Sequence, residues 1–444
     1  MMKFSVTCSL SDTLRLGVLS ETANKTSLNT PGCLLYTRYG SVPFLSPDIY
    51  EGISLIPGFS FASMSYIAER KSTLLKYGRG LVEFGALGKR KAILFQSDPT
   101  NSSSVAAAAK SSVPVWATGG RLQLSIAEYA KCVLMASPVA YQAPTDNETF
   151  LLDKNPTPKR CKNSVVRTAG YLRRLIEEHS LEERFRYQSA IALELAKKSL
   201  LVSIAGGHDL EFRLRSIADI DFSICSGVVI DGLLRNLPVS AVEVKDADNQ
   251  DKSLIDFLTT TLPKIFAHIP SHLPRFITQI WQPYDIALAA RSGCDIFDGS
   301  LPYRLSRSGI GWIYEDWNDA GQLDGVSKPR FLVFPFEEPI QLSESEQFLP
   351  IQPECKCFAC SHHTRIYISH LHIAQEMLAP MLLMIHNSHQ YYRFFADLRR
   401  SISLNKIDAF ISHAEKWIFP HHLVMVDKTN EFNKNSGNTD NDDV

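Results

Sequence analysis

Long hydrophobic runs are missing from this chain of 444 residues. The longest apolar stretch, near 378–385, contains a proline and is far shorter than the roughly 20 residues that a membrane-spanning helix needs. The first residues, MMKFSVTCSL, lack the apolar core of a secretory signal peptide. We therefore expect a soluble protein of the cytoplasm.

An excess of charge of one sign is also missing, because 46 Lys and Arg residues face 47 Asp and Glu residues, for a formal net charge of −1. This balance predicts no general attraction to nucleic acid, so any RNA binding would depend on local patches. Basic residues gather at 89–91, at 154–167 and at 399–400. Taken alone, each patch is typical of an ordinary solvated surface.

A framework of paired cysteines is absent as well, since the nine cysteines are odd in number and six of them are scattered. A reducing compartment explains this usage. The scattered cysteines are Cys8, Cys33, Cys132, Cys161, Cys225 and Cys294.

Short β-branched or aromatic runs alternate with helical patterns along much of the chain. The longest helical pattern covers 165–198, with apolar residues at near-helical spacing. This alternation predicts βα units and a largely parallel sheet. The predicted strands are 91–96, 113–117, 139–143, 200–205, 222–230, 274–280 and 294–298.

The segment PRFITQIWQPYDIALAARSGCDIFDG, 274–299, reads as one strand, helix and strand. It delivers Asp298 to the carboxyl end of its second strand. In an α/β barrel that end forms the active-site face.

Three cysteines crowd into CKCFAC, where Cys355, Cys357 and Cys360 follow a Cys-X-Cys-X-X-Cys spacing. Three thiolates this close can bind one tetrahedral Zn²⁺, and a fourth protein ligand would leave no open position for a catalytic water. Free thiols with surface histidines are the alternative. Periodicity does not choose the fourth ligand among His362, His363, His370, His372, His386 and His389.

The region 355–402 resembles the zinc-binding region of the tRNA-guanine transglycosylases, in which the cysteine loop precedes an Arg-X-Tyr segment and a helix carrying His-Asn. Here these are Arg365, Tyr367, His386 and Asn387. The resemblance implies His386 as the fourth zinc ligand, with one Zn²⁺ per subunit. It extends to YTRYGSVPFLSP, TGGRLQLS, IAGGHDLEFRLRS, IDGLL and GCDIFDGSLPYRLSRSG.

The fold that the resemblance implies is α/β, a (β/α)8 TIM-like barrel with a zinc-binding subdomain near the C-terminus. We expect the barrel over 1–342, and the zinc-binding subdomain with closing helices over 343–426. The polar, Asn-rich segment 427–444 cannot bury enough apolar surface to offset its ordering entropy, so we expect a disordered tail.

Members of this family exchange guanine for queuine or a precursor at the anticodon wobble position of tRNAs with GUN anticodons. Asp298 matches the family's nucleophilic aspartate, although Gly299 and Ser300 replace the usual Cys-Val after it. Arg304 and Arg307 match arginines that contact the anticodon loop. Surface salt bridges are the alternative for this pair.

The positions that handle the base depart from the family pattern. Ala117 replaces the acid/base aspartate, and a methyl group cannot accept a proton. The segment 204–206, Ile-Ala-Gly, stands in place of Val-Gln-Gly and lacks the amide that holds the heterocycle. Asp231 stands where bare backbone would approach the base, and Asp146 is a loose match to a second base-reading aspartate.

These losses predict a degenerate active site, because hydrogen bonds that define a polar substrate are lost together. By resemblance, we expect a non-catalytic accessory subunit that forms a heterodimer with a catalytic queuine tRNA-ribosyltransferase subunit of the same fold and helps to hold tRNA. Peripheral association with the mitochondrial outer membrane is a further expectation of the resemblance.

Two alternatives stay open from the sequence. The chain could be a catalytic transglycosylase that uses Asp298 as nucleophile, with Asp231 or Asp146 as acid/base. It could also be a zinc-stabilised RNA-binding or scaffold protein that takes no part in base exchange.

Overall fold

The computed structural model describes the greater part of the chain. The described residues are 2–11, 13–22, 26–101, 111–117, 120–147, 149, 157–180, 195, 197–233, 253–318, 330–336 and 342–419. The predicted disordered tail, 427–444, lies outside them, as does 181–194 of the predicted long helix.

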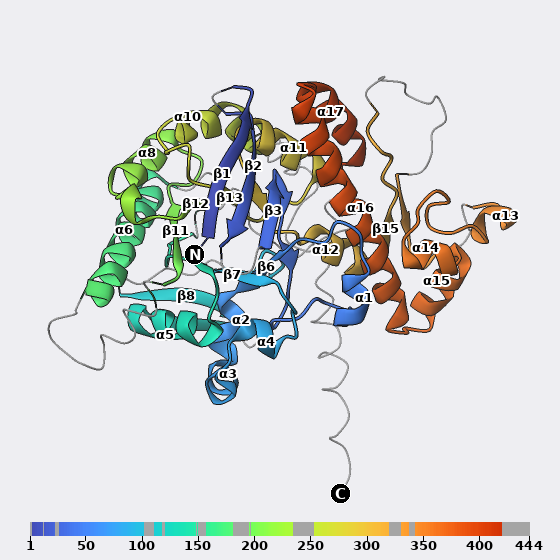
Figure 1. The fold of residues 1–444 in the computed structure, drawn as a ribbon, viewed down its shortest axis with the longest axis horizontal. Helices are drawn as coiled ribbons and strands as arrows, with labels where there is room; N and C mark the ends of the chain where they lie inside the picture. The colour runs from blue at the N-terminus through green and yellow to red at the C-terminus, as the bar shows by residue number, and fades with distance from the viewer. Residues whose placement is uncertain are drawn as a thin grey trace, which may run out of the picture.

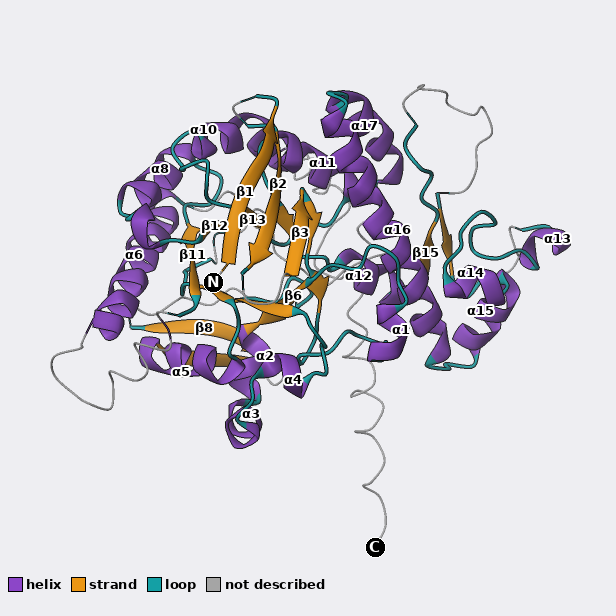
Figure 2. Ribbon diagram, in the orientation of Figure 1, coloured by secondary structure: helices purple, strands orange, loops and turns teal. Residues whose placement is uncertain are grey.

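Nine short strands form one parallel sheet in the order β4-β14-β13-β12-β11-β10-β7-β6-β5. Figure 2 shows strands of this sheet in orange, among them β6, β11, β12 and β13. The first and last strands in this order, β4 and β5, are parts of one extended segment, 32–36, so the ladder closes on itself. The (β/α)8 barrel prediction is therefore confirmed. The strands are β4 Gly32–Cys33, β5 Leu35–Tyr36, β6 Phe59–Ser63, β7 Lys91–Phe95, β10 Ala140–Gln142, β11 Ser199–Ile204, β12 Gly227–Ile230, β13 Arg275–Ile277 and β14 Ile296–Phe297.

Helices surround the barrel (Figure 1). Local capping explains where several begin: Ser125 and Glu128 form a capping box at the start of α5, and Asp209 accepts backbone hydrogen bonds at the start of α8. The helices are α1 Pro47–Glu51, α2 Met64–Glu69, α3 Lys71–Tyr77, α4 Leu81–Phe84, α5 Ile126–Ala136, α6 Pro158–Ser180, α8 Leu210–Ala218, the π-helix η3 Phe257–Thr261, α10 Leu262–Phe266, α11 Pro283–Arg291 and α12 Leu301–Arg307.

Two predicted strands differ from expectation in their place or extent. The run 113–117 lies in β8, Ser112–Ala117, which pairs with β9, Gly120–Ser125, as an antiparallel hairpin outside the barrel. The run 222–230 contributes only its second half to β12, and its first half contains the 3-10 helix η1, Phe222–Ile224.

An antiparallel sheet of β1 Met2–Ser9, β2 Arg15–Glu21 and β3 Thr26–Thr30 covers the amino end of the barrel. Arg15 fixes it there, because its guanidinium donates to both carboxylate oxygens of Asp295, just before β14, at 3.0 and 2.6 Å. This sheet does not cover the carboxyl ends of the barrel strands, where the active site of an α/β barrel lies.

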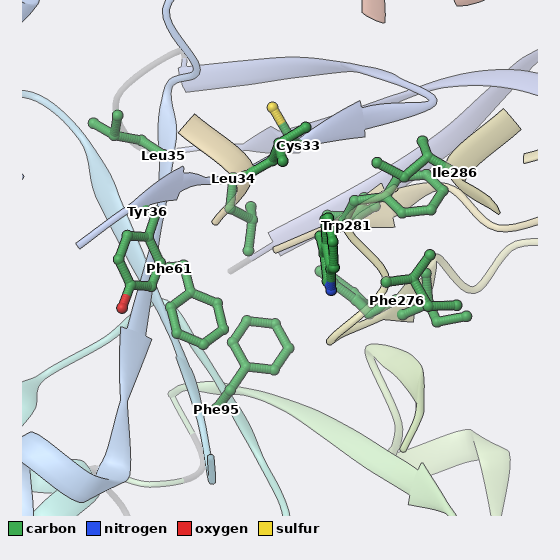
Figure 3. Close-up of a cluster of buried hydrophobic side chains, with 14 of the residues drawn as sticks. Cys33, Leu34, Leu35, Tyr36, Phe61, Phe95, Phe276, Trp281 and Ile286 are labelled. Atoms are coloured by element: carbon green, nitrogen blue, oxygen red, sulfur yellow. The ribbon is translucent and has the colours of Figure 1, made fainter. Parts of the chain in front are cut away.

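Aromatic side chains fill the barrel interior. The rings of Phe61 on β6 and Phe95 on β7 stack with centroids 4.9 Å apart, and Phe276 on β13 lies 5.9 Å from Phe95 (Figure 3). The interior is a packed core beneath the carboxyl ends of the strands.

The C-terminal part of the chain surrounds one long helix, α16, Leu378–Ser403. The side chain of Asn387 on this helix accepts from the backbone N–H of Trp312 at 2.9 Å and donates to the Ser306 hydroxyl at 3.0 Å, which joins α16 to the barrel. The division at 342–343 stays a prediction. The other elements are β15 Ile310–Trp312, β16 Phe331–Val333, α13 Glu344–Gln347, α14 Phe358–His362, α15 Arg365–Ile373, α17 Ile407–Ala414 and the 3-10 helix η4 Glu415–Trp417.

Among the helices that the structure describes, none combines the length and the apolar character needed to cross a bilayer.

Candidate functional site

A buried cluster of three thiols and one imidazole lies between the cysteine loop and α16. Cys357 caps the start of α14, Cys360 lies within α14, and His386 projects from α16. The ligand atoms of these residues and Cys355 all lie within 4.8 Å of one another. The Nδ1 atom of His386 is 3.8, 3.6 and 3.2 Å from the Sγ atoms of Cys355, Cys357 and Cys360. Ideal tetrahedral zinc bond lengths give a nitrogen-to-sulfur separation of about 3.6 Å.

The surroundings of the cluster orient its ligand atoms. The Nε2–H of His386 donates to the Trp312 carbonyl at 2.7 Å, so Nδ1 is the nitrogen that faces the sulfurs and would bind a metal ion after losing its proton. The backbone N–H groups of Cys357 and Cys360 donate to the Sγ atoms of Cys355 and Cys357 at 3.5 and 3.4 Å. This donor set fits Zn²⁺. The histidine that lies beside the three cysteines is His386, the one that the resemblance implies.

The acid–base properties of the cluster also suit a cation. Hydrogen bonds from Cys357 and Cys360 lower the pKa of the Cys355 thiol far below its usual range. The pKa of the Cys360 thiol is raised far above its usual range, because the protonated thiol forms hydrogen bonds with Cys355 and Cys357 and because burial disfavours the thiolate. Burial disfavours the imidazolium of His386, but bonds to Cys355 and Cys357 outweigh burial and raise its pKa to about 9. A divalent cation would displace these protons.

The second candidate region is the barrel mouth, where the strands end. Asp298 follows β14, as predicted, and is 1% exposed. Its carboxylate accepts from the backbone N–H groups of Gln279, at 2.6 Å, and Ser300, at 2.8 Å. Burial raises the pKa of Asp298, and the Ser300 hydrogen bonds and the Arg304 charge oppose that shift.

Arg304 and Arg307 lie on α12, which begins just after Asp298. Arg304 is buried, and its guanidinium donates to the Pro99 carbonyl and lies 5.6 Å from the ring centroid of Trp281. Arg307 is partly exposed. Arg304 therefore supports the floor of the mouth in this conformation, and the tRNA contacts of both arginines stay predictions.

Asp231 lies in the barrel mouth and is the centre of a hydrogen-bond network. It follows β12 and is 5% exposed, and its carboxylate accepts from the Gln142 amide at 2.7 Å, the Asn147 amide at 3.3 Å and the Gly232 N–H at 2.8 Å. Burial raises the pKa of Asp231, and the Gln142 and Gly232 hydrogen bonds oppose the shift. Sequence reasoning missed Gln142 and Asn147. The available signal was a polar residue, Gln142, at the end of an apolar run.

Asp146 lies apart from this network although it is close in sequence. Its buried carboxylate accepts from both terminal nitrogens of Arg160, at 2.8 and 2.5 Å, and from Arg167 at 3.1 Å. Both oxygens of this carboxylate are therefore occupied by guanidinium groups, away from the barrel mouth. Ala117, at the end of β8, and Ala205, just after β11, offer only methyl groups.

A groove of about 340 Å³ adjoins the metal cluster. Ile49 and Ile53 line it on the side of α1, and Phe358, Ile385 and His389 line it on the side of the cysteine loop and α16. The groove places apolar surface beside the candidate metal centre.

A family model described as queuine tRNA-ribosyltransferase matches residues 11–417. The chain belongs to this family. Among known members of the queuine tRNA-ribosyltransferase family, the protein named queuine tRNA-ribosyltransferase accessory subunit 2 from Xenopus tropicalis is 28% identical over 435 residues, which cover 92% of this chain and 98% of that protein. The proteins of the same name from Homo sapiens and Danio rerio are each 26% identical, and the matches cover 91% and 89% of this chain and 97% and 94% of those proteins.

Proposed function

We propose that the chain is the non-catalytic accessory subunit of a heterodimeric queuine tRNA-ribosyltransferase. It would support the exchange of guanine for queuine at the wobble position of tRNAs with GUN anticodons, those for Asp, Asn, His and Tyr. The composition of the barrel mouth carries this proposal, and similarity to proteins named as accessory subunits, over nearly the whole chain, supports it.

Base exchange needs a nucleophile, a group that moves protons, and polar groups that read the edges of the heterocycle. Asp298 could serve as the nucleophile. Ala117 and Ala205 supply neither a proton acceptor nor an amide, and the carboxylate of Asp231 is committed to Gln142 and Asn147 inside the chain. A base entering this mouth would meet groups that are already satisfied, so a retained carboxylate alone gives no turnover.

We also propose that Cys355, Cys357, Cys360 and His386 hold one Zn²⁺ ion per subunit. The buried donor set and the 3.2 to 3.8 Å nitrogen-to-sulfur distances support this assignment. Zinc would supply structural cross-linking there, because four protein ligands close its coordination sphere. The ligands would tie the cysteine loop to α16.

The pairing surface that we propose lies on the zinc-binding part of the chain. Large apolar side chains are exposed on α14, on α15 and just beyond: Phe358 is 54% exposed, Tyr367 40%, Ile373 68% and Met377 71%. Phe358 also lines the apolar groove, and exposed apolar side chains gathered in one part of a chain are typical of a protein interface. A catalytic subunit of the same fold would cover this surface.

We place the complex in the cytoplasm, with peripheral attachment to the mitochondrial outer membrane. This location rests on the family resemblance. Fractionation of cells that express the tagged chain, with alkaline carbonate extraction of the membrane pellet, tests it, because a peripheral protein is released by carbonate.

The main test measures labelled guanine incorporation into a cognate tRNA by this chain alone, by a catalytic subunit alone and by the two together. We expect incorporation in the mixture and none from this chain alone. Incorporation by the purified chain would favour the catalytic alternative, which the retained position of Asp298 supports. A chain that neither pairs with the catalytic subunit nor changes its activity would contradict the accessory role.

A further inference from the structure

Helix α6 carries an unusual concentration of positive charge for a chain of net charge −1. Its first acidic residue is Glu177, nineteen positions after it begins at Pro158. The basic residues before that point are Lys159, Arg160, Lys162, Arg167, Arg173 and Arg174.

The helical repeat sorts these residues into two parallel rows. At about 100° per residue, Lys159, Lys162 and Arg173 fall on one narrow stripe, and all three are exposed. Arg160, Arg167 and Arg174 follow at intervals of seven residues on a second stripe, about a third of a turn around the helix. At about 1.5 Å per residue, the exposed row from 159 to 173 is about 21 Å long.

The second row is held in place by a buried carboxylate. Arg160 and Arg167 both bind Asp146, which is fully buried, while each arginine side chain keeps 23% of its surface exposed. Asp146 therefore holds the two guanidinium groups in place, with part of each side chain open to solvent.

One end of this basic surface lies at the barrel mouth. Asp146 follows β10, and the next residue, Asn147, donates to Asp231 after β12. The first turns of α6 thus lie at the carboxyl end of the barrel, on the face that holds Asp298. Figure 1 shows α6 on one side of the barrel and α15 on the opposite side, so the basic surface is separate from the proposed pairing surface.

Resting on the proposed function, we infer that the two basic rows of α6 bind backbone phosphates of the tRNA. A straight row of this length suits the regularly spaced charges of a nucleic acid strand better than a single small anion. A membrane is a poorer match because large apolar residues of α6, among them Tyr171 and Leu175, are buried against the barrel, and Val166, which is 62% exposed, offers too little apolar surface to insert into lipid. The accessory subunit then holds RNA with a surface that needs no working base pocket.

The test compares two triple charge reversals in the complete heterodimer. Lys159→Glu/Lys162→Glu/Arg173→Glu changes the exposed row and leaves the Arg160 and Arg167 contacts to Asp146 intact. The control, with the same charge change at the amino end of the barrel, is Lys3→Glu/Lys89→Glu/Lys264→Glu, whose side chains are also exposed.

Fluorescence anisotropy with labelled cognate tRNA is measured over a series of KCl concentrations. We expect the α6 variant to lose about tenfold or more in affinity near 0.1 M salt, and the slope of log affinity against log salt to fall by roughly two. In the exchange assay, KM for tRNA rises while kcat stays unchanged. The control keeps wild-type binding, and a Lys159→Gln/Lys162→Gln/Arg173→Gln variant loses about half of the effect. Circular dichroism checks that the variants are folded.

The outcomes separate this inference from the proposed function. An active heterodimer whose affinity and salt slope survive the α6 reversal overturns the inference alone. A parallel assay measures binding to anionic phospholipid vesicles. If the α6 reversal abolishes vesicle binding and leaves tRNA binding intact, the basic rows bind a membrane and the inference is wrong. An inactive wild-type mixture overturns the proposed function, while direct tRNA binding still decides the role of α6.

Discussion

Replacing Cys357 by serine tests the metal centre with little other disturbance. The Cys357 Sγ atom lies 3.6 Å from His386 Nδ1 and accepts the Cys360 N–H at the start of α14. Serine is a good helix N-cap, so Cys357→Ser keeps this cap and removes one thiolate ligand. The effect therefore reports metal binding rather than helix capping.

The size of the effect follows from the coordination. Structural zinc contributes on the order of 10 kcal/mol to local folding, and a variant that no longer binds the ion loses this whole contribution. The site is buried and ties the cysteine loop to α16, so most of this loss falls on the zinc-binding part of the chain. We expect Cys357→Ser to lose zinc, to unfold that part and to abolish pairing with the catalytic subunit.

Zinc content by mass spectrometry, thermal unfolding and size-exclusion chromatography with the catalytic subunit are measured on the same preparation. Cys8→Ser, at an exposed free cysteine, is the matched control and should behave as wild type. A Cys357→Ser protein that has lost its zinc, yet unfolds at the wild-type temperature and pairs normally, would refute the structural role of the metal.

Three further changes give separate expectations. Arg15→Met leaves the Asp295 carboxylate buried without its cation, so urea unfolding should show a loss of about 3–5 kcal/mol, and Arg15→Met/Asp295→Asn should recover part of it; an unchanged midpoint would contradict this. Burial raises the folded-state pKa of Asp231 above its unfolded value, so its contribution to stability falls as pH rises through the folded pKa. Asp231→Asn should therefore raise the melting temperature at pH 7 and have less effect near pH 4, and a lower melting temperature at pH 7 would count against the reasoning. Tyr367→Glu should weaken pairing at least about tenfold without changing the melting temperature, because Tyr367 is 40% exposed on the proposed pairing surface, and titration calorimetry that finds wild-type affinity would exclude that surface.

The barrel could be predicted because its strands are short, buried apolar runs, and the segment 274–299 shows the βα unit directly. The hairpin partner of 113–117 could not, since a run of valine and tryptophan looks the same in a barrel strand and in an antiparallel hairpin. Which neighbour a strand pairs with depends on contacts distant in sequence.

Part of the candidate site could also be predicted from the sequence, and part could not. The spacing of the cysteines predicted a metal cluster, but six histidines suited it equally until a family resemblance chose His386. Its position is set by α16, whose Asn387 is tied to Ser306 of the barrel. The amides of Gln142 and Asn147 reach Asp231 from 89 and 84 residues away, and no local pattern carries that information.

The non-catalytic role is tested most directly by Asp298→Ala in the heterodimer, with guanine exchange into a cognate tRNA as the readout. The account predicts that exchange occurs only when both subunits are present and that its rate is unchanged by the substitution in this chain. Exchange by this chain alone that disappears with Asp298→Ala would contradict the account and make Asp298 a working nucleophile.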